Sequence, residues 1–144
     1  MVGEPIAAPM AALLDQHGIP AAGASAMQVT VEQLRHARLV LTMTRRHRSD
    51  VATLNPSVMR RAFTLLEFAA IVSTDEAIDQ IRATDPVERL TLATEWAARH
   101  RFLGPAAGAA YDVVDPYGRS KAMYRASLGQ IEPAVAAITR FTLK

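Results

Sequence analysis

The 144 residues contain no cysteine. This excludes disulfide bonds, zinc–thiolate sites and a thiol nucleophile within the chain. No apolar run reaches the length of a membrane span, so we expect no membrane partner. The amino-terminal stretch lacks a basic start and is interrupted by Pro5 and Pro9. It does not fit a secretion signal, and a cytoplasmic location is the default expectation.

The sequence also lacks an excess of charge of either sign. The 16 Lys and Arg residues stand against 14 Asp and Glu, a formal net charge of +2, so we expect no nucleic-acid partner. Hydrophobic residues make up 50% of the chain, which suits one domain over 1–144 with a real core. The histidines lack the paired spacing of metal ligands, and we expect neither a metal nor another cofactor. The histidines are His17, His36, His47 and His100.

Several stretches carry the local signals that begin a helix. Thr30 with Gln33 forms a capping box, and Thr44 and Asp85 are suited to cap the helices that follow them. Ser73 with Glu76 indicates another capping box. The expected helices cover 9–17, 30–37, 45–54, 74–82, a stretch from 86 onward, and 120–140. The helix that begins at 86 should place Leu90, Ala93, Trp96 and Ala97 on its core face. The last of these helices should bury Met123 or Tyr124, Leu128, Ile131, Val135 and Ile138.

Short apolar runs between these helices indicate strands. LVLTM, from Leu39 to Met43, is partly β-branched and flanked by charge, as in a strand buried on both faces. AFTLLEF, from Ala62 to Phe68, indicates a second strand that leads into a loop or a helix turn, and Val113-Val114 indicates a minimal third strand. The alternation with helices predicts the α/β class, with an incomplete parallel sheet flanked by helices. Two strands and a stub are fewer than such a sheet usually needs.

The stretch VVDPYGRS, 113–120, raises two alternatives. Asp115-Pro116-Tyr117-Gly118 fits a type I β-turn, since Asp, Pro and Gly are favoured at its first, second and fourth positions. The same tetrapeptide could be a catalytic loop in which Asp115 donates a proton. The sequence alone favours the turn, and the two interpretations are compatible.

Other charged groups favour structural roles. TRRHRSD gathers Arg45, Arg46 and Arg48 with a histidine, which could contact phosphate but is more often a solvated helix face. Asp112 and Asp115 stand three residues apart on a strand-to-loop stretch. Two carboxylates placed in this way need not converge, so they do not predict a metal site or a glycosidase pair.

The order of several motifs resembles one family. ARLVLTMTRRHRSDVATLNPSVMRRAFTLLEF, followed at a distance by DVVDPYGRS, is similar to the low-molecular-weight protein tyrosine phosphatases, in particular the actinobacterial members. VGEPIAAPMAALLDQHGI resembles the segment after that family's second strand. The resemblance covers nearly the whole chain, and residues 73–101 resemble a helical insertion.

The resemblance implies a phosphatase fold and mechanism. The family has a four-stranded parallel sheet and a Cys-x5-Arg loop that holds phosphate at a helix N-terminus. A cysteine thiolate attacks phosphorus, and an aspartate in an Asp-Pro loop protonates the leaving phenolate. By resemblance, Asp115 is that general acid, and Tyr117 is the aromatic at the mouth of the substrate pocket. The substrate would be a phosphotyrosine protein.

The nucleophile of that mechanism is missing. Ser25 has no adjacent arginine or activating base, so it is a poor substitute. Similar proteins tend to carry an arginine at Met27 and an acid at Arg38. The resemblance therefore implies a chain without its catalytic amino-terminal segment, including the first two strands, which should be inactive alone.

A second hypothesis is a binding module without catalysis. The strand from Leu39 to Met43 would pair with the missing first strand, and without it an apolar edge is exposed. Such edges pair with other chains, so a homodimer through this strand, or completion by a separate peptide, is predicted.

Overall fold

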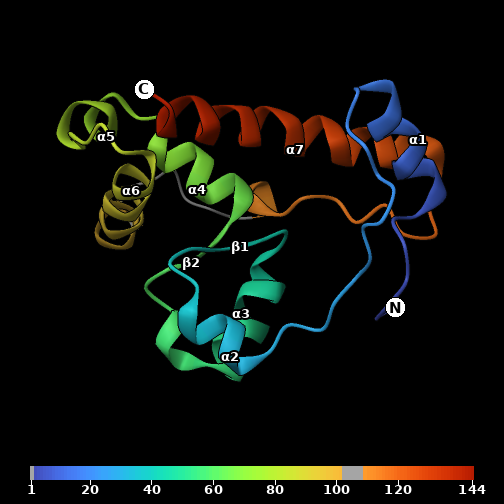
Figure 1. Cartoon of the computed structure of the whole chain (residues 1–144), viewed down its shortest axis with the longest axis horizontal. Helices are drawn as coiled ribbons and strands as arrows, with labels where there is room; N and C mark the ends of the chain where they lie inside the picture. The colour runs from blue at the N-terminus through green and yellow to red at the C-terminus, as the bar shows by residue number, and fades with distance from the viewer. Residues whose placement is uncertain (1, 102–108) are drawn as a thin grey trace.

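Two short parallel strands form the centre of the molecule. The computed structural model describes residues 2–101 and 109–144. Strand β1, Val40–Thr42, pairs with β2, Ala62–Thr64, with Leu41 opposite Phe63 (Figure 1). Within the described residues this sheet has two strands. The predicted fold class, an incomplete parallel sheet flanked by helices, is confirmed.

The helices surround these strands in a simple order. α3, Arg45–Leu54, and the 3₁₀ turn η1, Pro56–Val58, connect β1 to β2. α2 and α3 lie on one side of the strands, whereas α4 and α7 lie on the other (Figure 1). The other elements are α1 Ala8–Gln16, α2 Val31–His36, α4 Leu65–Val72, α5 Asp75–Gln80, α6 Pro86–His100, η2 Ala109–Tyr111 and α7 Lys121–Thr142. None of the helices in the described ranges is long and apolar enough to cross a membrane.

Local caps explain most of the helix starts. Thr30 and Gln33 make the predicted capping box, and the side chains of Thr44 and Asp85 accept the predicted amide bonds. The capping box expected at Ser73 is wrong. Thr74 caps α5, whereas the Ser73 hydroxyl donates to the Ala69 carbonyl at the end of α4.

The strands are shorter than predicted. β2 ends at Thr64 because Thr64 and Glu67 form a capping box that starts α4. The apolar run after Thr64 is therefore a buried helix, so the predicted strand that leads into a loop or a helix turn is found, with the strand limited to Ala62–Thr64. Val113-Val114 is not a strand either, although the Val113 N–H donates to the Met43 carbonyl at 2.9 Å, directly after β1.

Helix α4 lies in the middle of the apolar core. It packs against α7 and α6, and Phe63 and Phe68 are fully buried with their rings 5.4 Å apart. Ala93 and Ala97 of α6 are buried against it as predicted, and Trp96 is partly buried at its border. On α7 the expected stripe is correct except at Val135, which is 46% exposed; its neighbour Ala134 is buried instead.

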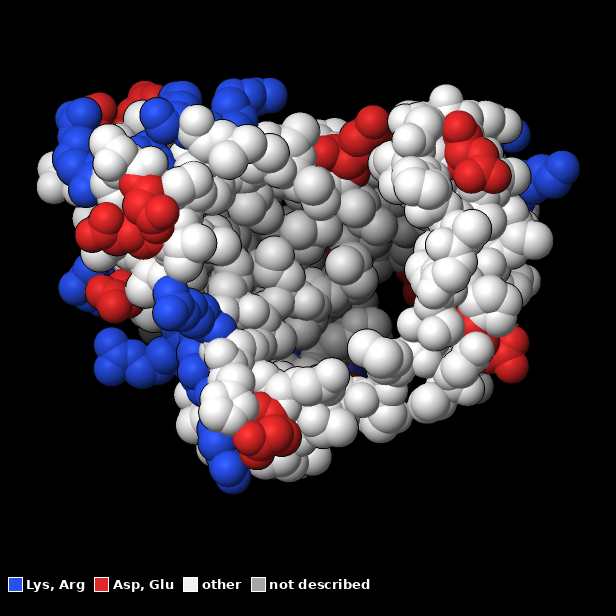
Figure 2. All heavy atoms as spheres, in the orientation of Figure 1, with Lys and Arg blue, Asp and Glu red and all other residues white. Residues whose placement is uncertain are grey.

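Helix α1 lies at the far end of α7, and a long extended segment connects it to α2 (Figure 1). Figure 2 shows that this face of the molecule is hollowed near its centre, between the part that carries α1 and the part that carries α5 and α6. In the same orientation, the segment between η2 and α7 crosses above this hollow (Figure 1). That segment carries Asp115.

Candidate functional site

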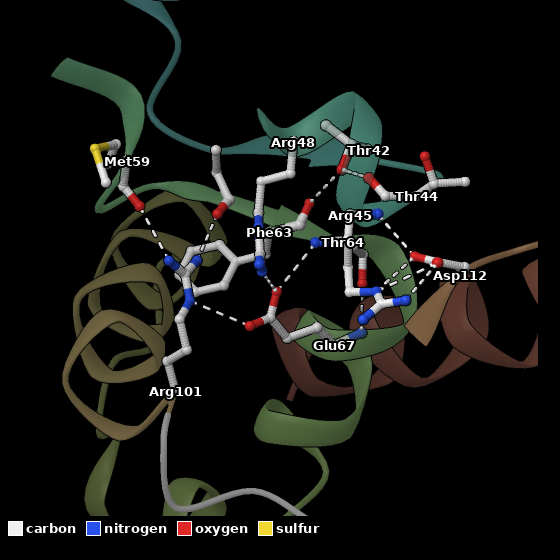
Figure 3. Close-up of polar contacts among 11 residues, drawn as sticks. Thr42, Thr44, Arg45, Arg48, Met59, Phe63, Thr64, Glu67, Arg101 and Asp112 are labelled. Carbon is white, nitrogen blue, oxygen red and sulfur yellow. Dashed lines mark hydrogen bonds and ion pairs between the residues drawn. The ribbon is translucent and has the colours of Figure 1, made fainter. Parts of the chain in front are cut away.

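Asp112 is fixed at the carboxyl end of β1 by one arginine. Its Oδ1 accepts the Arg45 backbone N–H at 2.7 Å, at the first residue of α3. The Arg45 guanidinium donates to the same carboxylate, with Nη2 3.1 Å from Oδ2 (Figure 3). These hydrogen bonds hold the pKa of Asp112 below its usual value. Asp112 is therefore a structural anchor, in line with the interpretation that Asp112 and Asp115 are not a catalytic pair.

Two more hydrogen bonds fix Val113 and Val114, the residues that follow Asp112. The Val113 N–H donates to Met43, as described above, and the Val114 N–H donates to Oε1 of Gln130 on α7 at 2.9 Å. Three consecutive residues are thus tied to β1, α3 and α7. The position of Asp115 relative to the sheet is set by these anchors.

Asp115 itself is exposed at the start of a turn. Its Oδ1 accepts the Tyr117 N–H at 3.0 Å. The backbone turn bond runs from the Arg119 N–H to the Pro116 carbonyl at 2.9 Å, one residue later than predicted. Gly118 therefore occupies the third position of the turn. Its φ of +67° is left-handed, as a type II turn requires at this position, so the turn is type II and not the expected type I.

The structure shows two properties that the proposed roles need. The Asp115 carboxyl is accessible, and the Tyr117 ring beside it is 62% exposed. Both residues stand on one short turn, held at its base by the bonds of 112–114. The roles of general acid and of pocket-mouth aromatic stay predictions.

The described residues offer Ser25 no activating partner. Ser25 is exposed and forms an isolated antiparallel bridge with Pro5. No described residue hydrogen-bonds its hydroxyl in this structure, and the 144 residues hold no cysteine. Among residues 2–101 and 109–144, no group of three or more His, Asp or Glu side chains could hold a metal ion.

A buried charge cluster was missed by the sequence reasoning. Glu67 on α4 has a side chain only 5% exposed, yet it contacts two arginines (Figure 3). Arg48 Nη1 donates to Glu67 Oε2 at 2.6 Å, and Arg101 Nε lies 3.1 Å from Oε1 without hydrogen-bond geometry. Burial lowers the pKa of Arg101, and Glu67 partly offsets this shift. The Thr64-x-x-Glu67 spacing could have shown the cap, but not the two arginines.

Arg101 also fixes the turn before β2. Its guanidinium donates to the carbonyls of Met59 and Ala62 and lies over the Phe63 ring, 4.2 Å from the centroid. Burial, and secondarily the negative charge of Glu67, raises the pKa of Tyr111.

These contacts correct the interpretation of TRRHRSD. Arg46 and His47 are exposed, as a solvated helix face requires. Arg45 and Arg48 instead bind the two carboxylates described above. Half of this basic run therefore serves tertiary structure, and the predicted solvated helix face is correct for Arg46 and His47 but not for Arg45 and Arg48.

The geometry defines an α/β protein with an anchored aspartate loop at the carboxyl end of parallel strands. The family profile of the low molecular weight phosphotyrosine protein phosphatases matches residues 1–89. The chain therefore belongs to this family. A comparison with curated protein sequences gives no significant match.

The fold agrees with a solved structure. The crystal structure of the Erwinia amylovora tyrosine phosphatase AmsI superimposes with a TM-score of 0.65 at 19% identity, over 97% of this chain and 67% of that one. This similarity shows the shared fold and no more. The family match ends before Asp115, so it does not test the predicted role of Asp115.

Proposed function

We propose that this chain carries the general-acid part of a phosphotyrosine phosphatase site and does not hydrolyse phosphate esters by itself. One observation carries the proposal. An accessible Asp115 follows three anchored residues at the carboxyl end of β1, in 144 residues that contain no cysteine. This supports the proposal, because the chain offers an accessible carboxyl on an anchored turn but not the family's cysteine nucleophile.

The proposed chemistry assigns one step to this chain. When a thiolate from another segment attacks phosphorus, the bond between phosphorus and the phenolic oxygen breaks. Asp115 donates its proton to that oxygen, so tyrosine leaves as the neutral phenol. Tyr117 lines the mouth of the pocket. The anchors of 112–114 keep the acid positioned, since general-acid catalysis needs hydrogen-bond reach to the leaving oxygen.

The open edge of β1 favours completion by a second segment. The Val40 N–H donates to the Arg61 carbonyl of the neighbouring strand. In a parallel ladder, alternate residues direct both backbone groups to the same neighbour, so Leu41 directs its groups away from β2. No strand among the described residues occupies that side. A strand followed by Cys-x5-Arg and a helix would pair there, and its loop would reach the same end of the sheet as Asp115.

A complementation assay tests this proposal. We would measure p-nitrophenyl phosphate hydrolysis by the chain alone and mixed with a strand–Cys-x5-Arg–helix polypeptide from a family member. We expect no turnover alone, turnover in the mixture, and a loss of about 10²–10⁴-fold with Asp115→Asn. Asp50→Asn, at an exposed site on α3, is the matched control. Turnover by the chain alone, or a mixture that is inactive although bound, would overturn the proposal.

The same edge favours a second candidate, a homodimer formed through strand 39–43. Met43→Pro tests it, because the Met43 N–H faces the open side, so a proline removes a donor of that edge without breaking a hydrogen bond to β2. Met43 is 39% exposed, so little packing is lost, and Met43→Ala is the control. We expect a dimer in sedimentation that Met43→Pro dissociates. A monomer at high concentration would contradict this candidate.

A further inference from the structure

A groove with several arginines lies near the amino ends of β1 and β2, at the end of the sheet opposite Asp115. It has a volume of about 480 Å³ and lies between the turn before β2 and helix α6. Arg38 stands two residues before β1 and Arg61 directly before β2, so in a parallel sheet both lie at its amino end. Asp115 follows the carboxyl end, so the groove is distinct from the candidate catalytic site. The lining includes Arg38, Arg60, Arg61, Thr94, Glu95 and Arg99.

The four arginines of the groove differ in what they already bind. Arg61 is committed to structure, since its guanidinium donates to the Ala37 carbonyl at 2.9 Å and to Ser57 Oγ at 3.3 Å. Arg38, Arg60 and Arg99 are exposed and contact no carboxylate among the described residues. Figure 2 shows basic side chains gathered on the side of the molecule where α6 faces the α2–α3 layer.

An apolar pocket adjoins this groove. It holds about 180 Å³ and is lined by Leu39, Val87 and Leu90, together with Arg38 and Thr94, which also line the groove. The two cavities therefore form one continuous surface with a cationic part and an apolar part. Such a surface fits a ligand that carries an anionic group beside an apolar one.

We propose that this groove binds a phosphorylated peptide segment. The phosphate would lie among Arg38, Arg60 and Arg99, whose planar guanidiniums suit a phosphate through paired hydrogen bonds. An adjacent apolar side chain would occupy the pocket beside Leu90. No aromatic side chain among residues 2–101 and 109–144 lines either cavity, and the net charge of the chain is only +2, which disfavours single-stranded nucleic acid.

The test uses a short peptide with phosphoserine next to leucine and its unphosphorylated form, titrated against the full chain by calorimetry. We expect the phosphate to tighten binding, and Arg60→Glu and Arg99→Glu each to weaken it about tenfold, which is about 1.4 kcal/mol. Both residues are exposed, so the fold should persist. Arg125→Glu, an exposed site on α7, is the charge-matched control and should bind like the original chain.

Two further changes test the charged part and the apolar part of the groove separately. Glu95 is the carboxylate in the lining, so Glu95→Gln should tighten phosphopeptide binding. A leucine-to-serine change in the peptide should weaken it by emptying the apolar pocket. Equal binding of both peptide forms, unchanged binding by the Arg60→Glu, Arg99→Glu double variant, or tighter binding of a single-stranded oligonucleotide would each overturn the proposal.

Discussion

Replacing Glu67 by glutamine should destabilise the fold more than any other single charge change in the described residues. The Glu67 side chain is 5% exposed and lies between Arg48 and Arg101, which are 29% and 19% exposed. Glutamine keeps the shape and an oxygen for the Thr64 amide, but it removes the negative charge. The two guanidiniums would then repel each other with no anion between them.

The magnitude follows from the burial of the three groups. Removing one partner from a fully buried ion pair costs about 3–5 kcal/mol. Water reaches part of both arginines, so we expect a loss of about 2–3 kcal/mol in the free energy of unfolding. Glu67→Ala also removes the capping interaction and should cost about 1 kcal/mol more.

Urea and thermal unfolding followed by circular dichroism would measure this loss. For a chain of this length, Glu67→Gln should lower Tm by roughly 5–10 °C. Glu76→Gln, at an exposed site on α5, is the matched control and should stay within about 0.5 kcal/mol of the original chain. If Glu67→Gln unfolds like the control, the cluster is not what holds α4 to α3 and to the end of α6.

Three further predictions follow from single contacts. Because Arg45 lowers the pKa of Asp112 in the folded state, the stability lost in Asp112→Asn should be largest at neutral pH. In acid titrations this loss should begin to shrink as the pH falls below the unfolded pKa of about 3.9, and it should vanish below the lowered pKa of the folded state. Because burial raises the pKa of Tyr111, urea unfolding above about pH 10 should become easier for the original chain than for Tyr111→Phe. Arg61→Ala should cost about 1–2 kcal/mol and speed amide exchange in α2, whose last carbonyls it binds.

Much of the fold could be predicted from the sequence because the signals are local. A helix start needs only a residue such as Thr44 or Asp85 and the amides three positions on. The end of β2 could not be predicted in the same way. Both a buried strand and a buried helix are uniformly apolar, so the run after Thr64 fits either, and only the cap at Glu67 separates them.

In the candidate site, too, the residues with local sequence signals could be predicted and those held by distant contacts could not. By family resemblance the Asp-Pro motif made Asp115 a candidate, and this motif lies within a few residues. The contacts that position the loop and the turn before β2 are distant in sequence: Asp112 binds Arg45, 67 positions away, and the Arg101 guanidinium bonds carbonyls 42 and 39 positions away. No periodic pattern encodes such contacts, so Arg45 and Arg48, which bind Asp112 and Glu67, could not be told from the exposed residues of TRRHRSD.

Helix α6 connects the buried cluster to the arginine groove. Its Arg99 lines the groove, and Arg101, directly after the helix, binds Glu67 and the carbonyls on both sides of the Arg60–Arg61 turn. One guanidinium therefore sets the distance between the two walls of the groove. Lysine could keep the charge at 101 but could not reproduce this forked geometry. The groove should consequently lose its shape when the Glu67 cluster is broken, although no residue that would contact a phosphate has changed.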